Sequence, residues 1–137
     1  RTFAPGHHGS TYGGNPLACA AATAVLETLA DETPPETARA LGETLETHFR
    51  SSLEHAECLR EIRRAGLMIG VELAADCGDL VQRALDAGLL INVTAGSTIR
   101  LLPPLVMSET QAAQFGSELA AVVDRWWQDR GTLAGAA

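Results

Sequence analysis

The first half of the chain repeats hydrophobic residues at helical spacing. Residues 15–30 are rich in alanine, and their larger apolar side chains fall on one face of a helix. In the next segment an apolar residue stands at every fourth position: Leu41, Leu45, Phe49 and Leu53. This spacing is typical of amphipathic helices that bury one face. It predicts one helix over residues 15–30 and a second that runs from about residue 34 to about residue 56.

Residues at the predicted helix starts support these boundaries. Asn15 is a strong N-cap residue, and Pro16 suits the first helical position because no backbone donor is needed there. The segment Thr33-Pro34-Pro35-Glu36 combines a capping box with a proline at the first helical position. Ser108-Glu109-Thr110-Gln111 is a second capping box. It predicts a last helix that ends near residue 130.

The second half of the chain changes to short β-branched runs. Residues 67–73, 89–93 and 98–102 are each predicted to form a strand. Between the first two lies a helical segment, residues 79–87, which Gly88 ends in the C′ position. The order helix, helix, strand, helix, strand, strand, helix predicts an α+β fold in which helices cover one face of a small sheet.

Composition narrows the class of protein. With 137 residues, 46% of them hydrophobic and 20% charged, the chain is typical of a soluble globular protein. Its net charge of −7 offers no basic surface for nucleic acid or an anionic membrane. No apolar run approaches the roughly 20 residues of a membrane span. Cys19, Cys58 and Cys77 are odd in number and widely spaced, which favours free thiols in a reducing cytoplasm over a disulfide framework or a zinc site.

A polar, glycine-rich loop with the sequence HGSTYGGNPLACAA occupies residues 8–21 together with the start of the first helix. Its glycines permit close approach of the backbone to a ligand, and Ser10 and Thr11 offer two adjacent hydroxyls. Such a loop can bind an anion such as phosphate; an ordinary helix-entry loop is the alternative. We expect no metal site at His7 and His8, because adjacent histidines point in different directions and no third ligand stands nearby.

This motif resembles the signature of class III pyridoxal-phosphate (PLP) aminotransferases, especially the acetylornithine and ornithine aminotransferase branch. The resemblance implies that Thr11 hydrogen-bonds the PLP phosphate and that Ser10 approaches the substrate. In that family the loop, here residues 9–14, reaches the active site of the partner subunit. The resemblance therefore implies a homodimer with PLP as its cofactor, and we expect it in the cytoplasm.

Two later segments are similar to the same family. In IRLLPPLV, residues 99–106, Arg100 stands alone in an apolar run, where an unpaired charge would be costly. An edge-strand arginine with its head in water is the alternative, whereas the resemblance implies that Arg100 faces a substrate carboxylate or a glutamate of the large domain. Residues 63–72 are similar to the pattern R-G-x-G-L-x-x-G-x-E, except that Arg64 stands where glycine is common. We expect a slightly different turn there and a structural or surface role for Glu72.

The sequence contains no lysine. PLP-dependent transamination needs a Schiff-base lysine, which in the relatives lies upstream of this loop. We therefore expect no catalytic residue in this chain and no activity when it is isolated. The resemblance implies that residues 1–30 end the large PLP domain and that residues 31–137 form the C-terminal small domain of a fold type I PLP aminotransferase.

The same resemblance implies a reaction for the full-length enzyme. It would transfer the δ-amino group of N-acetylornithine through PLP to 2-oxoglutarate, as a step of arginine biosynthesis. Ornithine and 4-aminobutyrate are alternative amino donors. A non-enzymatic binding or assembly module derived from the family is the alternative from another class.

Overall fold

The structure is a computed structural model, and it describes residues 7, 9–31 and 35–134. It divides into two compact units, residues 1–34 and residues 35–137. The described part of the first unit contains an exposed loop and one helix, α1 (Pro16–Asp31), none of whose residues is buried. The predicted helix over residues 15–30 is confirmed to within one residue at each end.

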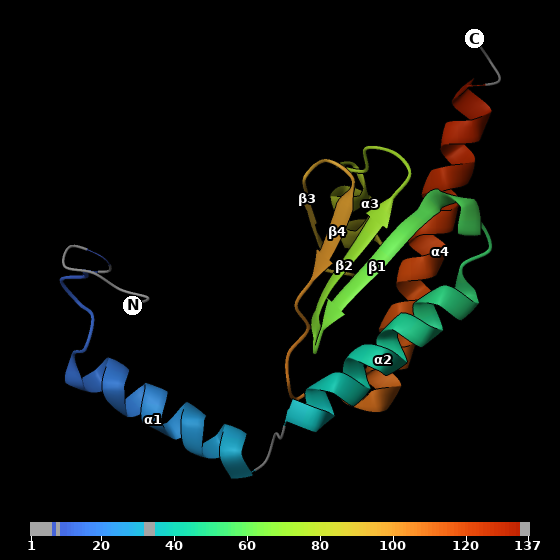
Figure 1. The fold of residues 1–137 in the computed structure, drawn as a ribbon. Coiled ribbons are helices and arrows are strands. Elements are labelled where there is room, and N and C mark those ends of the chain that lie inside the picture. Colours follow the sequence, from blue (N-terminus) through green and yellow to red (C-terminus); the bar gives the residue numbers. More distant parts are fainter. Residues whose placement is uncertain (1–6, 8, 32–34, 135–137) are drawn as a thin grey trace. The chain divides into compact units, whose positions relative to one another are not determined.

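The described residues of the second unit form three longer helices, one short 3₁₀ helix and four strands. In chain order these are α2 (Pro35–Ser52), η1 (Ala56–Cys58), β1 (Leu59–Ala65), β2 (Met68–Leu73), α3 (Leu80–Asp86), β3 (Asn92–Thr94), β4 (Thr98–Leu101) and α4 (Glu109–Ala134). The strands make one sheet in the order β1-β2-β4-β3, and every neighbouring pair is antiparallel. Figure 1 shows α2 and α4 lying along one side of this sheet. The predicted α+β fold is confirmed.

The sequence pattern predicts three strands, and the described residues form a fourth, β1, that the pattern does not indicate. Four of its seven residues are charged, so the alternation of apolar and polar positions is weak. It pairs with β2 through a hairpin whose turn contains Gly66 at φ +59°, a left-handed conformation that glycine adopts readily. Because β1 is an edge strand, its outward charges remain solvated, and tertiary pairing rather than local sequence makes it a strand.

Helix α2 ends at Ser52, four residues before the predicted end. The buried carboxylate of Asp124 on α4 accepts hydrogen bonds from the backbone amides of Glu54 and His55, at 3.0 and 2.9 Å. These bonds hold the chain in a non-helical connection from α2 to β1. A partner so distant in the sequence cannot be read from local spacing, which explains the error.

The local capping signals near the other elements are confirmed. The Ser108 hydroxyl accepts the amide of Gln111 at 3.2 Å, and the Gln111 side chain accepts the amide of Ser108 at 2.9 Å. Gly88 follows α3 at φ +82°. Helix α4 continues to Ala134, past the predicted end near residue 130. The capping box predicted at Thr33 and Pro34 lies outside the described residues.

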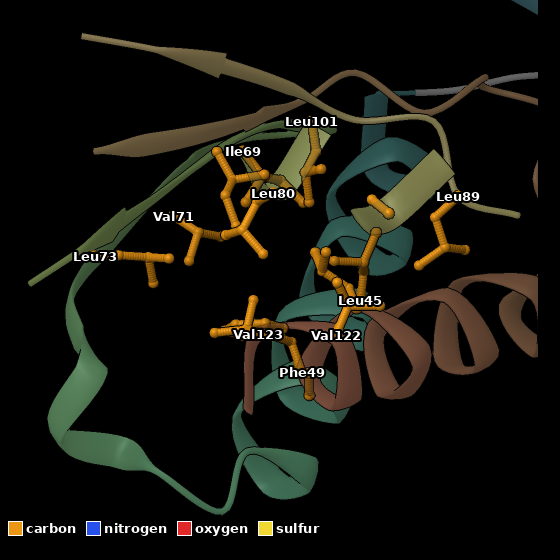
Figure 2. Packing of buried hydrophobic residues seen from close by; sticks show 14 of the residues in the cluster. Leu45, Phe49, Ile69, Val71, Leu73, Leu80, Leu89, Leu101, Val122 and Val123 are labelled. Atoms are coloured by element: carbon orange, nitrogen blue, oxygen red, sulfur yellow. The ribbon is translucent and has the colours of Figure 1, made fainter. Parts of the chain in front are cut away.

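The core lies between one face of the sheet and the three helices, as Figure 2 shows. Its labelled side chains include those of Leu45, Phe49, Ile69, Val71, Leu73, Leu80, Leu89, Leu101, Val122 and Val123. Because side chains alternate along a strand, the intervening residues of β2 and β4 project from the opposite face. That opposite face, called the open face below, carries Gly70, Glu72 and Arg100.

Two glycines allow close approach to α2. A Cβ atom at Gly116 on α4 would lie only 2.6 Å from the carbonyl oxygen of Leu45 and 3.0 Å from the amide of Phe49. A Cβ atom at Gly42 would overlap the carbonyl oxygen of Gly66 in the hairpin turn. Helix α2 is thus held tightly between α4 and the hairpin, and the hairpin in turn fixes the position of the open face.

Within the described residues, no helix is both long and apolar enough to cross a membrane.

Candidate functional site

The glycine-rich loop enters α1 through a side-chain cap. The side-chain oxygen of Asn15 accepts the amide of Ala18 at 3.0 Å, which confirms the predicted N-cap. The Asn15 amide group also donates to the carbonyl of Tyr12 at 2.6 Å, so one side chain fixes both the helix start and the preceding turn. Gly14 takes φ +76°, a conformation that strains residues with a side chain.

Ser10 and Thr11 are exposed on this loop. The carbonyl of Ser10 accepts the amide of Gly13 at 3.3 Å, which closes a tight turn. In the described part of the chain, neither hydroxyl donates to another protein group. Two free hydroxyls beside a helix N-terminus can donate hydrogen bonds to the oxygens of an anion.

Arg100 lies on the open face of the second unit. Its neighbours on β4, Ile99 and Leu101, are buried against the helices, whereas Arg100 itself is exposed. Strand β4 lies between β2 and β3. Arg100 is therefore not on an edge strand, and that part of the alternative interpretation is wrong. Register places Arg100 opposite Gly70 on one side and Asn92 on the other.

Two hollows meet at Arg100. The first, of about 340 Å³, lies over Gly70 and is also lined by Arg63, Met68 and Thr98. The second, of about 530 Å³, lies against the segment 88–92 and the two prolines that follow β4; Phe115 and Met107 form part of its apolar wall. A guanidinium between two largely apolar hollows suits a ligand that carries both a carboxylate and a carbon chain.

The other arginines of the sheet already have partners. Arg63 donates to the carboxylates of Glu61 and Glu72, the latter at 2.7 Å, and these bonds raise the pKa of Arg63 above its ordinary value. Arg60 donates to the carbonyl of Ala74. Among the sheet arginines of the described chain, Arg100 alone makes neither an ion pair nor a hydrogen bond through its side chain.

Arg64, which replaces the expected glycine, packs toward α2 rather than toward the open face. Its side chain donates to the Glu46 carboxylate at 3.1 Å and to the carbonyl of Arg39 at 3.3 Å. Burial raises the pKa of Glu46, but hydrogen bonds from Arg50 and Arg64 outweigh it, so the pKa lies below its ordinary value. Arg64 belongs to β1, and the turn itself is made at Gly66.

The potential metal ligands do not gather into a cluster in the residues that the structure describes, where no three histidine, cysteine or acidic side chains are placed to share a metal. His7 is exposed, and His8 lies outside the described residues. All three cysteines are free; Cys19 is exposed, while Cys58 and Cys77 are buried. Burial raises the pKa of each buried thiol to about 11.

The structure thus places the predicted site residues in two groups. Ser10 and Thr11 share the loop of the first unit, and Arg100 belongs to the sheet of the second. Sequence reasoning missed Arg63 and Gly70 as neighbours of Arg100. An isolated glycine inside a predicted strand was the available signal for Gly70, because such a glycine often marks close approach of a ligand or another backbone. Arg63 begins the family-like segment of residues 63–72, but nothing in that segment indicated that it lies near Arg100.

Comparison with known proteins finds aminotransferases both among family models and among curated relatives. A family model described as "Aminotransferase class-III" matches residues 1–123. The acetylornithine aminotransferase of Methanothermobacter thermautotrophicus is 47% identical over 80% of this chain and 28% of its own length. Acetylornithine aminotransferase 1 of Bordetella pertussis is 44% identical over 90% of this chain and 32% of its own length. The chain therefore spans about a third of the length of the curated relatives it matches.

Solved structures show the same likeness in three dimensions. The crystal structure of acetylornithine aminotransferase from Elizabethkingia anophelis matches with a TM-score of 0.75 and 34% identity, over 88% of this chain and 31% of that one. The ornithine aminotransferase of Toxoplasma gondii ME49 matches with a TM-score of 0.78 and 34% identity, over 93% and 31%. With a family model that covers residues 1–123 and relatives at this level of identity, the chain belongs to the class III aminotransferase family.

Proposed function

We propose that this chain works as the C-terminal part of a PLP-dependent acetylornithine aminotransferase. The reaction transfers the δ-amino group of N-acetylornithine to 2-oxoglutarate and yields N-acetylglutamate semialdehyde and glutamate. Relatives named acetylornithine aminotransferase at 44–47% identity support the choice of donor. The structural observation that carries the proposal is Arg100, a guanidinium in the middle of the sheet that has no carboxylate partner in the described residues.

The residues of the glycine-rich loop fit the phosphate group of PLP. The Thr11 hydroxyl would donate to a phosphate oxygen, and Ser10 would face the substrate. Both hydroxyls are exposed and donate to no group among the described residues, so they can donate to phosphate oxygens. When bound, PLP supplies an electron sink that stabilises the carbanion formed at the substrate carbon. The amine of the Schiff-base lysine must come from outside these residues, because the sequence contains no lysine.

Arg100 would bind a carboxylate. Its planar guanidinium presents parallel donors that match the two oxygens of a carboxylate, a geometry that a lysine ammonium cannot reproduce. During the half-reaction with 2-oxoglutarate, this carboxylate would belong to the substrate. During the half-reaction with the amino donor, a glutamate elsewhere in the enzyme would pair with Arg100 instead.

The organisation of the whole enzyme is part of the same proposal. We assign residues 1–30 to the end of the large domain and residues 31–137 to the small domain, and the division of the structure near residue 34 is compatible with this boundary. The loop of residues 9–14 would act in the active site of the partner subunit of a homodimer. The free thiols are compatible with a cytoplasmic location.

A comparison of amino donors tests the proposed function. The full-length protein, loaded with PLP, is given 2-oxoglutarate together with N-acetylornithine, ornithine or 4-aminobutyrate, and glutamate formation is measured. We expect the highest kcat/KM with N-acetylornithine. A higher value with ornithine or 4-aminobutyrate would reassign the donor within the family. Failure to form glutamate with any of the three would overturn the proposal and favour a non-enzymatic module.

A further inference from the structure

Two acidic side chains share the open face with Arg100. Glu61 on β1 and Glu72 on β2 stand directly opposite each other in the register. Like charges in a cross-strand pair repel, so a cation between the two carboxylates stabilises this arrangement. Arg63 provides that cation, since the same guanidinium nitrogen donates to both carboxylates.

Arg63 and Arg100 are placed symmetrically about Gly70. Register pairs Gly70 with Arg63 on β1 and with Arg100 on β4, so the three residues form a row across the sheet. Glu72 lies two residues further along β2, diagonal to both arginines. Diagonal neighbours on one face are about 7–8 Å apart, a separation that long side chains can bridge. Glu72 is therefore within reach of either arginine, and the structure shows it bonded to Arg63 at 2.7 Å.

The fold itself does not require the glycine between the two arginines. A Cβ atom at Gly70 would lie 3.6 Å from the Thr98 methyl group, an ordinary van der Waals contact. A glycine inside a strand costs about 0.5–1 kcal/mol relative to alanine. Its position over the hollow between Arg63 and Arg100 leaves space for a group that approaches Arg100 from the open face.

We infer that Arg63 is a positioning residue for substrate binding: it holds Glu72 away from Arg100 and so leaves the Arg100 guanidinium free for an incoming carboxylate. This inference rests on the proposed function for the identity of that carboxylate, 2-oxoglutarate. Without Arg63, Glu72 would pair with Arg100 across the Gly70 hollow and compete with the substrate. Glu61 lies one strand further away, about two strand spacings of 4.8 Å from Arg100, and cannot compete in the same way.

The test uses three variants of the full-length, PLP-loaded enzyme and a fourth that serves as a control. Arg63→Met removes the guanidinium that holds Glu72. Arg63→Met with Glu72→Gln removes this guanidinium and also the carboxylate that would compete with the substrate for Arg100. Arg63→Met with Glu61→Gln has the same net charge as the second variant but keeps Glu72. Arg125→Met removes an exposed arginine of α4 and serves as the control for loss of a surface charge.

We expect Arg63→Met to raise the KM for 2-oxoglutarate about two- to fivefold, the range that an exposed competing ion pair can account for, with kcat little changed. Glu72→Gln should restore the KM in the Arg63→Met background, whereas Glu61→Gln should not. Both double variants remove the repulsion between Glu61 and Glu72. If Arg63 only stabilised the sheet, the two double variants should therefore have the same KM. An unchanged KM in Arg63→Met, or equal rescue by the two double variants, would overturn the inference. Arg125→Met should behave as wild type, and a matching rise in KM there would also overturn it.

A crystal structure of the Arg63→Met variant gives a readout that does not depend on activity. The Glu72 carboxylate should lie within ion-pair distance of the Arg100 guanidinium. A Glu72 side chain that stays away from Arg100 would contradict the inference even if the enzyme is active. Inactivity of the wild-type enzyme toward 2-oxoglutarate would instead reject the proposed function, and the crystal structure would still decide the role of Arg63.

Discussion

Side chains along β4 alternate between the two faces of the sheet. Ile99 and Leu101 are therefore buried, and Arg100 between them is exposed on the open face. Since its side chain has no partner in the described residues, replacing it should cost the fold little. Arg100→Lys keeps the charge but loses the planar fork. We expect kcat/KM in the 2-oxoglutarate half-reaction of the full-length enzyme to fall about ten- to a hundredfold, the worth of a hydrogen bond to a charged group.

Two further measurements on the same variant decide what Arg100 binds. If a glutamate of the enzyme also pairs with Arg100, the half-reaction with N-acetylornithine should slow as well. The melting temperature should stay near the wild-type value in either case. A lowered melting temperature with both half-reaction rates intact would show that Arg100 is structural.

Thr11 offers a second test at the scale of one residue. Thr11→Ala removes a hydroxyl that we expect to donate to the charged PLP phosphate, a bond that contributes roughly 1.5–3 kcal/mol. The affinity of the full-length enzyme for PLP should therefore fall about ten- to a hundredfold in equilibrium dialysis. Thr11→Ser keeps the hydroxyl and should retain most of the affinity. Equal PLP affinity in the wild type and the alanine variant would mean that Thr11 only shapes the loop.

Cys58 and Cys77 should be nearly inert thiols. Because burial raises their pKa to about 11, only about one thiol in a thousand is ionised at pH 8. Alkylation of the folded protein with iodoacetamide at pH 8, followed by mass spectrometry, should modify both far more slowly than after unfolding in urea. Their reactivity should rise as the pH approaches 11. Rapid modification of either residue in the folded protein at pH 8 would contradict their burial.

At the scale of elements, the contact between α2 and α4 depends on Gly116. A methyl group there would press against the backbone at Leu45 and Phe49, which cannot move aside as a flexible side chain would. Gly116→Ala should destabilise the protein by about 1–3 kcal/mol, the usual cost of overpacking. The shift can be measured by urea unfolding, followed through the fluorescence of the buried Trp126 on α4.

Gly131 on the same helix is the matched control. A Cβ atom there would meet nothing within 4 Å, so Gly131→Ala should be neutral or stabilise the protein by about 0.5–1 kcal/mol through helix propensity. Equal effects of the two substitutions would show that the close approach of α2 and α4 does not matter for stability.

The elements differ in how far the sequence predicts them. The N-cap at Asn15 and the capping box at Ser108 depend on residues within a few positions of each other, and both are confirmed. The end of α2 depends on Asp124, about 70 positions away, and β1 depends on pairing with β2. In the candidate site, Arg100 was predictable as a lone charge in an apolar run. The neighbourhood of Arg63 and Glu72 required the register of three strands, which no local pattern contains.

For the molecule as a whole, we expect these residues to serve a PLP enzyme whose Schiff-base lysine lies outside them. The chain spans 28–32% of the two curated relatives described above and carries no lysine of its own. The full-length protein and the isolated 137-residue chain should therefore differ in one chemical property. Only the full-length protein should fix PLP covalently when borohydride is added.

Borohydride trapping measures that property directly. Both proteins are incubated with PLP, reduced with borohydride, freed of unbound cofactor and digested for mass spectrometry. We expect one PLP per full-length chain, on a lysine outside these residues, and none on the isolated chain. The N-terminal amine is the group of the isolated chain that could mimic such fixation, so a second sample with this amine acetylated serves as the control. Stoichiometric fixation within these 137 residues, or none in the full-length protein, would show that the Schiff-base lysine is not where we expect it.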